Sequence, residues 1–553
     1  MRLYSHLTRS HFSIQAEKIQ KHNKMEHQNA RDVNGKEKSD ESRESITEGI
    51  TGRYANIDDA ILRANGHEAA MRRQFNWLSA LGLGFSITNS WVGYLSCFGQ
   101  NLIYGGPQSA IFGLIVAFVA QFIVTLGLSE IASAFPSSGG QYHFCYIIAP
   151  KKSKRFTAFV IGWLSVIAWW IVTCSGVSLF AITLSGVINF WIPDFVASQW
   201  QVYLIYVATG LFTVTPVIFA SKHLAWVVQF ALWASILGFL LFLFVSTGMH
   251  STVKDSSFLT DSGFGTSGWN SSTAWLLGIA NAMYAFGATD GAIHISEEME
   301  QPGRRVPQVM IMTMIVGMVT CFPLMVALLL FVKDLDAIIA SPLPSMELVY
   351  QATGSRSVTM FLVAVLLLTY FTCLPSQWVT DGRLAWAFAR DNGVPYPDYF
   401  AHINPKMELP LRTTIAAFIF FTLYGLLYLA STTAFNSIIT SAVLFLNITY
   451  AVPQGILLLQ GREKTLPTRY LRLGYLGYFC NLFSILFIAL LGVLVCMPPA
   501  IPVTVQSMNY TSVVMVGLFS IVIILWFVHG KRNFNGPKID WELLEASNTA
   551  LLA

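Results

Sequence analysis

The sequence has few charged residues. Lys, Arg, Asp and Glu make up 12% of its 553 residues, and the net charge is only +4. A positive excess this small gives no indication of nucleic-acid binding. The sequence also lacks a Walker phosphate loop, an HExxH zinc motif and a GxSxG nucleophile motif, so ATP-driven pumping and hydrolysis have no support. We therefore expect no enzyme, no cofactor and no metal site.

Closely spaced cysteines are also lacking. The seven cysteines form no CxxC pair, and each lies in or beside an apolar segment. Seven is an odd number, which does not fit a complete disulfide framework. Small buried hydrophobic side chains are therefore a better interpretation of these cysteines than metal ligands or disulfides.

Apolar residues are abundant instead. They make up 54% of the chain, aromatic residues make up 14%, and the mean hydropathy is +0.54. Many apolar runs of about 20 residues, the length that crosses a bilayer, predict an all-α polytopic membrane protein. The predicted spans are 77–98, 107–133, 156–190, 201–220, 224–247, 274–296, 307–332, 357–388, 412–430, 434–459, 473–496 and 511–529. We expect a disordered N-tail over residues 1–74, a transmembrane domain over 75–530 and a C-tail over 531–553.

The loop charges predict how these twelve spans are oriented. Fourteen Lys and Arg residues lie in the loops that join even to odd spans, and only Lys254, Lys333 and Arg356 lie in the others. The positive-inside rule therefore places both termini in the cytoplasm. The sequons at Asn270 and Asn509 fall in predicted outside loops, so both are candidate glycosylation sites. We expect a multi-pass protein of the plasma membrane, with the vacuolar membrane as the alternative.

Small and polar residues interrupt two of the apolar spans. The first span contains Ser86, Thr88, Asn89 and Ser90, and the sixth contains Phe286-Gly287-Ala288-Thr289-Asp290. A carboxylate at the bilayer centre costs at least ~2.5 kcal/mol, and non-helical backbone persists there only around a cavity. Paired interruptions in two halves of a chain indicate a transport site. The alternatives are that Asp290 lies at a solvated helix end and that the small residues only allow close helix packing.

A broken helix exposes amides at one half-helix start and carbonyls at the other half-helix end. We expect residues 86–89 to provide amides and hydroxyls, and residues 286–288 to provide carbonyls. Asp290 could attract an ammonium group, carry a coupled proton or cap a half-helix. Aromatic faces could hold a quaternary ammonium, although most aromatics in spans serve packing. The predicted substrate site is Ser86, Thr88, Asn89, Ser90, Trp91, Trp170, Phe286, Gly287, Ala288 and Asp290.

Charged residues also lie at predicted cytoplasmic ends of spans. Glu130, at the inner end of span two, is a candidate gating residue that pairs with an inside cation, or else a solvated helix-end charge. The loop containing Glu297, Glu298, Arg304 and Arg305 is either an ion-pair latch or a solvated surface. His143 and His294 are possible proton carriers, although a lone histidine is more often structural.

Five motifs resemble one known family. They are GFSITNSW at 84–91, GGP at 105–107, SEIASAFPSSGGQY at 129–142, EE at 297–298 with Pro302 and Pro307, and ARDNGVP at 389–395. Over residues 70–530 the chain resembles the amino acid–polyamine–organocation superfamily, and in particular its fungal amino acid/choline transporter branch.

The resemblance implies a fold and an activity. The fold is a five-plus-five inverted repeat, with spans 1–5 at about 77–247, spans 6–10 at about 274–459 and spans 11 and 12 at about 473–529 appended. Helices 1 and 6 would be discontinuous, with the substrate between them. Transport would be secondary and proton-driven, or sodium-driven as in some relatives; span five lacks the lysine that some proton-coupled relatives carry.

The expected function is import of choline or a related small amine by a monomer in the lipid bilayer. The alternatives are a 4-aminobutyrate or amino acid permease of the same fold and, less favoured, a nutrient receptor that does not transport.

Overall fold

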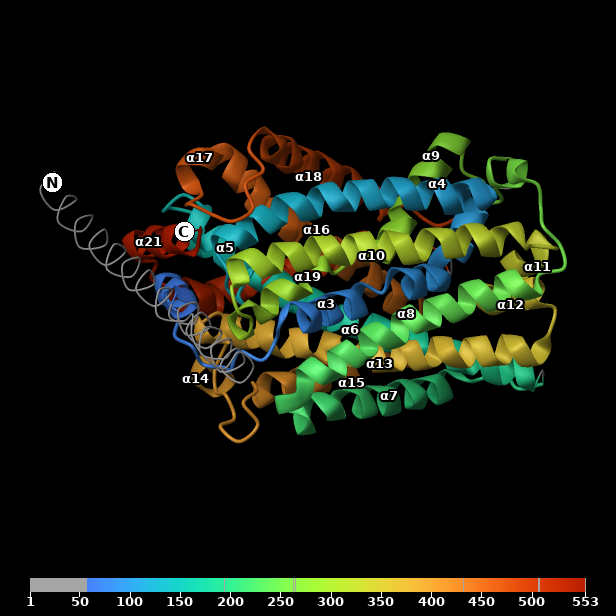
Figure 1. The fold of residues 1–553 in the computed structure, drawn as a ribbon, viewed down its shortest axis with the longest axis horizontal. Helices are drawn as coiled ribbons and strands as arrows, with labels where there is room; N and C mark the ends of the chain where they lie inside the picture. The colour runs from blue at the N-terminus through green and yellow to red at the C-terminus, as the bar shows by residue number, and fades with distance from the viewer. Residues whose placement is uncertain are drawn as a thin grey trace, which may run out of the picture. The chain divides into compact units, whose positions relative to one another are not determined.

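The computed structural model describes residues 57–552 except 193, 262, 264, 431, 506 and 507. The long helices are α3 (Trp77–Thr88), α4 (Ser90–Ala134), α6 (Lys154–Trp191), α7 (Gln199–Phe219), α8 (Leu224–Met249), α9 (Ser271–Ala282), α10 (Pro302–Leu330), α13 (Arg356–Arg390), α15 (Leu411–Ala430), α16 (Thr432–Gln460), α18 (Tyr475–Leu494) and α19 (Thr511–Leu525) (Figure 1). The other elements are α5 (Gln141–Ile148), η1 (Ser221–His223), η2 (Ser256–Leu259), η3 (Met283–Phe286), η4 (Thr289–Glu298), α11 (Leu335–Ala340), α12 (Pro344–Thr353), α14 (Pro397–Phe400), α17 (Arg462–Thr465), η5 (Trp526–Gly530), α20 (Lys531–Asn533) and α21 (Trp541–Leu552).

The described part of the chain contains helices and two isolated β-bridges but no strand, which confirms the predicted all-α class. Ten helical stretches in the described residues are long and apolar enough to cross a membrane. The first runs over Trp77–Ala134 and contains the residues of predicted spans one and two. Predicted span six is not among the ten because α9, η3 and η4 divide it. The total of twelve spans therefore stays a prediction.

The connection between the first two predicted spans is shorter than we expected. Residues 99–104, predicted as a loop, are helical, and α4 changes direction only at Gly105 and Gly106. Gly106 has φ 63° and ψ −155°, a conformation open only to glycine at low cost. Pro107 then restarts the helix, since a proline at the first helical position loses no backbone hydrogen bond.

The helices bury one face against each other and expose the other. α10 packs along α4, α3 along α8, and α13 along α6 (Figure 1). On α8, Trp226, Phe230, Trp233, Leu237 and Phe244 are all more than half exposed. Their spacing of three, four and seven residues forms one apolar stripe along the helix. Such a stripe on the outer face of a long helix fits contact with lipid chains.

The end of the predicted N-tail is folded. Residues 1–56 lie outside the described residues, but residues 57–64 are helical, and Ile61 and Ala64 are buried. The C-terminal segment packs on this helix, since the Asp540 amide donates to the Ala64 carbonyl over 2.8 Å. The predicted disorder is therefore wrong for residues 57–64, where apolar residues contact the rest of the protein.

Candidate functional site

The first predicted span breaks at Asn89. This residue has φ 31° and ψ 59°, in the left-handed region that asparagine tolerates better than most residues. Its backbone still bonds to both half-helices, with its amide donating to Phe85 O and its carbonyl accepting from Gly93 N. Its side chain donates to Cys373 Sγ over 3.2 Å and accepts from Ser235 Oγ over 2.8 Å. The break is therefore fixed to α13 and α8.

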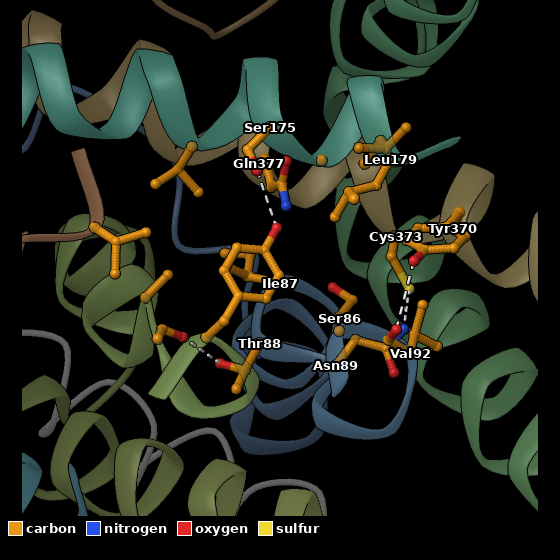
Figure 2. A pocket seen from close by; sticks show the side chains of 18 of the residues that line it. Ser86, Ile87, Thr88, Asn89, Val92, Ser175, Leu179, Tyr370, Cys373 and Gln377 are labelled. Carbon is orange, nitrogen blue, oxygen red and sulfur yellow. Dashed lines mark hydrogen bonds between the residues drawn. The ribbon is translucent and has the colours of Figure 1, made fainter. Parts of the chain in front are cut away.

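The sixth predicted span breaks at Gly287 and Ala288. The turn η3 ends at Phe286, Gly287 is extended, and Ala288 has φ 58° and ψ 34° before η4 begins. A non-glycine residue in this region carries backbone strain, which persists only where surrounding structure holds it. The Thr88 hydroxyl of the first break donates to the Gly287 carbonyl over 3.3 Å (Figure 2). These contacts confirm that both helices are discontinuous and that the two breaks meet.

A cavity of about 80 Å³ lies where the two breaks meet (Figure 2). It is lined by Ser86, Ile87, Thr88, Asn89, Val92, Gly93, Val172, Ser175, Gly176, Leu179, Tyr284, Gly287, Ala288, Tyr370, Cys373, Leu374, Gln377, Ile439, Val443, Leu446 and Asn447. None of these lining residues is charged. A water needs roughly 10–15 Å³ by this measure, so the cavity has room for a solute the size of several waters.

Five of the predicted site residues line this cavity. They are Ser86, Thr88, Asn89, Gly287 and Ala288. The freed groups differ from our expectation, because residues 86–88 form the last turn of α3 and so expose carbonyls rather than amides. The free amides of this break belong instead to residues 90–92, the first turn of α4.

The other predicted side chains of the first break point elsewhere. Ser90 packs against Gly317, where an added Cβ would lie 2.2 Å from the serine hydroxyl. Trp91 donates to Ser235 Oγ over 3.0 Å and lies against Phe242, with ring centroids 5.3 Å apart. Neither residue lines the cavity, because helical periodicity turns positions 90 and 91 away from the face that carries 89, 92 and 93. Their contact with substrate stays a prediction.

The two other predicted aromatic contacts are also packing residues. Trp170 lies against Phe420 of α15, with ring centroids 5.3 Å apart, and Phe286 lies against Phe118, with centroids 5.4 Å apart. Neither lines the cavity. The aromatic residues that do line it are Tyr284 and Tyr370, of which Tyr284 exchanges a 3.0 Å hydrogen bond with Ser175.

Asp290 is fully buried but does not line the cavity. Its carboxylate accepts hydrogen bonds from Gln141 Nε2 (2.6 Å), Trp169 Nε1 (3.2 Å), Tyr450 OH (2.5 Å) and His294 Nε2 (3.1 Å). The carboxylate therefore does not reach this cavity, and direct contact of Asp290 with substrate stays a prediction. The carboxylate instead fastens η4 to α5, α6 and α16, which the sequence could not show because these partners lie far along the chain.

Sequence reasoning missed other parts of the cavity wall. Ser175 and Gly176 of α6 and Gln377 of α13 contribute polar surface, and Asn447 of α16 does the same. Each is a small or polar residue inside an otherwise apolar span. That was a usable signal, although such residues also occur at close helix contacts.

A second, larger cavity of about 760 Å³ adjoins the first. The two share Tyr284, Ile439 and Val443, and the larger one extends to residues 339–345, 494–499 and 508–509. These segments belong to connections predicted to be extracellular. The central cavity thus lies below a wide space on the predicted outer side.

Ion pairs close the opposite side. Glu298 bonds to Arg383 over 2.7 Å, and Glu297 bonds to Arg390 over 2.8 Å. The latch that we predicted within the loop is therefore made with α13 instead. Arg305 pairs with Glu300, and Arg304 lies 5.1 Å from the centre of the Tyr470 ring.

Glu130 forms another closed cluster on the same side. This buried carboxylate bonds to Arg462 and, over 2.6 Å, to Arg469, and it also accepts from the Leu473 amide over 3.1 Å. Glu130 is therefore paired with cations from a loop predicted to be inside, as its predicted role requires, and is not the solvated helix-end charge of the alternative. Whether it gates transport stays a prediction.

The segment before α3 covers this closed side. His67 bonds to Asp391 over 2.9 Å, and Gln74 bonds to Glu298 over 2.7 Å. Burial would raise the pKa of Asp391, but the neighbouring His67 and Arg390 outweigh it and lower that pKa to about 2. Burial, together with His67, lowers the pKa of His143 to about 3, so His143 stays neutral and is a poor proton carrier.

The two sequons differ in their surroundings. Asn270 is exposed and caps α9 through its oxygen, which leaves its amide nitrogen toward solvent. The Asn509 amide nitrogen instead donates to Val495 O over 2.7 Å and to Met497 O over 2.9 Å. A glycan on Asn509 would replace one of its two amide hydrogens and so remove one of these hydrogen bonds, and this structure therefore favours Asn270 of the two.

Comparison with known proteins identifies the family. Residues 75–519 match the family model described as amino acid permease. The choline transporter of Saccharomyces cerevisiae is 31% identical over 486 residues, which cover 87% of this chain and 86% of the relative. The swainsonine transporter of Arthroderma benhamiae is 27% identical, with 87% and 96% of the two chains covered. The 7-keto 8-aminopelargonic acid transporter of S. cerevisiae is 28% identical, with 83% and 93% covered. The chain therefore belongs to the amino acid permease family of the amino acid–polyamine–organocation superfamily, and it is a multi-pass membrane transporter rather than an enzyme.

Proposed function

We propose that this transporter imports choline or a related small amine across the plasma membrane, as a monomer with cytoplasmic termini and by alternating access. The observation that carries the proposal is the uncharged cavity between the two helix breaks. Its size suits a small solute, and the similarity to a choline transporter over most of both chains points to the same class of substrate.

The cavity offers what a quaternary ammonium needs. Such a cation has no N–H to donate, so it is held by electronegative surfaces rather than by paired hydrogen bonds. The C-terminal ends of α3 and η3 both face the cavity, and helix C-termini carry partial negative charge. Tyr284 and Tyr370 add aromatic faces, and a cation–π contact in a dry site contributes about 2 kcal/mol.

The two sides of the cavity support transport by alternating access. The larger cavity leads to the predicted outside, and the Glu298–Arg383, Glu297–Arg390 and Glu130–Arg469 pairs close the predicted inside. Release into the cytoplasm requires these pairs to separate. In this proposal Glu130 gates the inner side together with the two pairs made by α13.

An amino acid such as 4-aminobutyrate is the second candidate. The first turn of α4 begins at Ser90, and no side chain caps it, so its amides are available to a carboxylate. A zwitterion would place its carboxylate there and its ammonium at the carbonyls near Gly287. A receptor that does not transport is less favoured, because a site with an open side and a latched side is what a carrier uses.

Uptake of labelled choline and 4-aminobutyrate by cells that lack their own carriers tests the proposal. Tyr284→Leu should weaken choline uptake by roughly 30-fold in KM, the equivalent of about 2 kcal/mol. Tyr284→Phe keeps the ring and loses only the bond to Ser175, so it is the matched control and should retain most uptake. If neither solute accumulates above background with the unaltered protein, the proposed substrate class is wrong.

A further inference from the structure

A second buried carboxylate lies close to the cavity and has no use in the site described above. Asp381 of α13 is 1% exposed. Neither of its carboxyl oxygens has a hydrogen-bond partner in the described part of the chain. A buried ionised carboxylate without a donor or a cation is costly, so this environment accommodates the neutral, protonated acid.

The groups around Asp381 supply no counter-charge. On α6, the neighbours are the Thr173 hydroxyl, which is the nearest donor to the Asp381 carboxyl, and the Cys174 thiol; neither carries a positive charge. On α7, Tyr206 lies beside that thiol and donates to Phe421 O.

Most charged residues on the elements packed against α13 are already engaged, and Asp398 of α14 is exposed. Arg383 and Arg390 of α13 bind Glu298 and Glu297 of η4, Asp290 and His294 of η4 bind each other, and Arg412 of α15 donates to Tyr399 O. The helices α3 and α8, which also pack against α13, contain no ionisable residue.

Asp381 is connected to the cavity by other polar atoms without partners. Gln377 lies one turn before Asp381 on the same face of α13, lines the cavity and has an unpartnered Oε1 (Figure 2). Gly176 of α6 also lines the cavity and lies so close to Gln377 that an added Cβ would be 2.6 Å from Oε1. Thr173, one turn before Gly176 on α6, lies beside Asp381. Gln377, Thr173 and Asp381 thus form a polar row that leads from the cavity into the contact between α6 and α13.

We propose that Asp381 is the site that carries the coupled proton during transport. The proton comes from hydronium in water that enters from the outer cavity. One O–H bond of the hydronium breaks, one O–H bond forms at a carboxyl oxygen of Asp381, and a water molecule is left. When the inner side opens, the proton passes to water there and the carboxylate is ready for another proton. This assignment rests on the proposed transport function, but it concerns the coupling ion rather than the solute.

Vesicles containing the purified full-length protein separate coupling from binding. Exchange of labelled for unlabelled choline without a pH gradient reports solute binding and helix movement. Accumulation driven by an inwardly directed proton gradient reports coupling. Asp381→Asn should exchange choline within about twofold of the unaltered protein and should lose gradient-driven accumulation, and Asp381→Glu should restore part of it.

An infrared measurement tests the same site without any solute. The unaltered protein at neutral pH should show the carbonyl band of a protonated carboxyl group, and Asp381→Asn should lose intensity there. Asp290→Asn is the matched control and should leave this band unchanged, because four donors hold Asp290 ionised.

Each outcome decides one of the two proposals. Gradient-driven accumulation by Asp381→Asn equal to that of the unaltered protein would overturn the proton site. So would an unchanged infrared band, or equal loss of exchange and accumulation in a variant that still folds. Absence of choline exchange by the unaltered protein, with the infrared difference present, would instead overturn the proposed solute and keep the proton site.

Discussion

Asp290 and Asp381 are both fully buried aspartates within the helical bundle, and their surroundings are opposite. Asp290 accepts four hydrogen bonds from three other helices and from its own, whereas neither oxygen of Asp381 has a partner among the described residues. The first carboxylate can stay ionised and hold elements together. The second can be buried cheaply only as the neutral acid. The comparison indicates that the partners of a buried carboxylate, rather than its depth, decide whether it can keep its charge.

The largest expected effect follows from removing the first carboxylate. Asp290→Leu leaves the donors of Gln141, Trp169 and Tyr450 buried without an acceptor. Each orphaned donor costs roughly 1–3 kcal/mol, so the total loss is several kcal/mol. The thermal unfolding midpoint of the detergent-purified protein should fall strongly in Asp290→Leu. It should fall less in Asp290→Asn, because that side chain keeps one acceptor oxygen. If Asp290→Leu left the unfolding midpoint unchanged, Asp290 would have no structural role, and the contrast between Asp290 and Asp381 would be wrong.

A carboxylate held by a cation should give the next largest effect. Arg383→Leu leaves Glu298 buried without its cation, a change that typically costs about 3–5 kcal/mol. Glu298→Leu together with Arg383→Leu removes both charges and should recover much of that loss. The same unfolding assay measures both variants. If the double variant were no more stable than Arg383→Leu, the loss in the single variant would not come from the unpaired charge of Glu298.

Asp58, which lies outside the predicted spans, has fewer partners than Asp290 and more than Asp381. One oxygen accepts from the Gln301 amide over 2.8 Å, and burial is the main reason that the pKa of Asp58 rises to about 6. When this segment detaches, the carboxyl returns to its usual pKa near 3.8. The docked segment therefore binds more protons than the detached one between these values. Docking of residues 57–66 should strengthen roughly tenfold as the pH falls from 7 to 5.

Hydrogen–deuterium exchange of the amides in residues 57–66 measures this docking. Protection, corrected for the intrinsic effect of pH on exchange, should rise toward pH 5. In Asp58→Asn, which cannot titrate, the corrected protection should not depend on pH. A rise of the same size in that variant would assign the effect to another group.

The smallest expected effect on stability belongs to Asp381. Replacing an unpartnered buried acid by a group of similar size orphans no donor, so Asp381→Asn and Asp381→Leu should change the unfolding free energy by less than about 1 kcal/mol. Comparison with Asp290→Leu in the same assay gives the sharpest contrast between the two aspartates. A large loss of stability in Asp381→Leu would mean that this carboxyl has a structural partner.

Local sequence predicted much of the fold. The limits of α6, α8 and α13 agree with the predicted spans 156–190, 224–247 and 357–388 to within a few residues. Both helix breaks lie inside the predicted interruptions. These features depend on apolar run length and on residues that lower the cost of leaving the helix, and both are visible in a window of about twenty residues.

The sequence did not predict which side chains face the cavity. Ser90 and Trp91 lie within the correct interruption but on the face of α4 away from the cavity, because the packing of other helices decides which face of α4 meets the cavity. Asp381 was visible as a lone acid in an apolar span, yet only its missing partners distinguish it from a residue such as Asp290.

By itself the sequence determined that this protein is a bundle of membrane helices, that two of them are broken, and which residues form the breaks. Hydropathy and local backbone preference decide these features without reference to distant parts of the chain. Only the tertiary structure decided that Asp290 is bound and Asp381 is not, since the donors to Asp290 come from helices more than a hundred residues away in either direction. In the low dielectric between helices those distant partners determine whether a carboxylate keeps its charge.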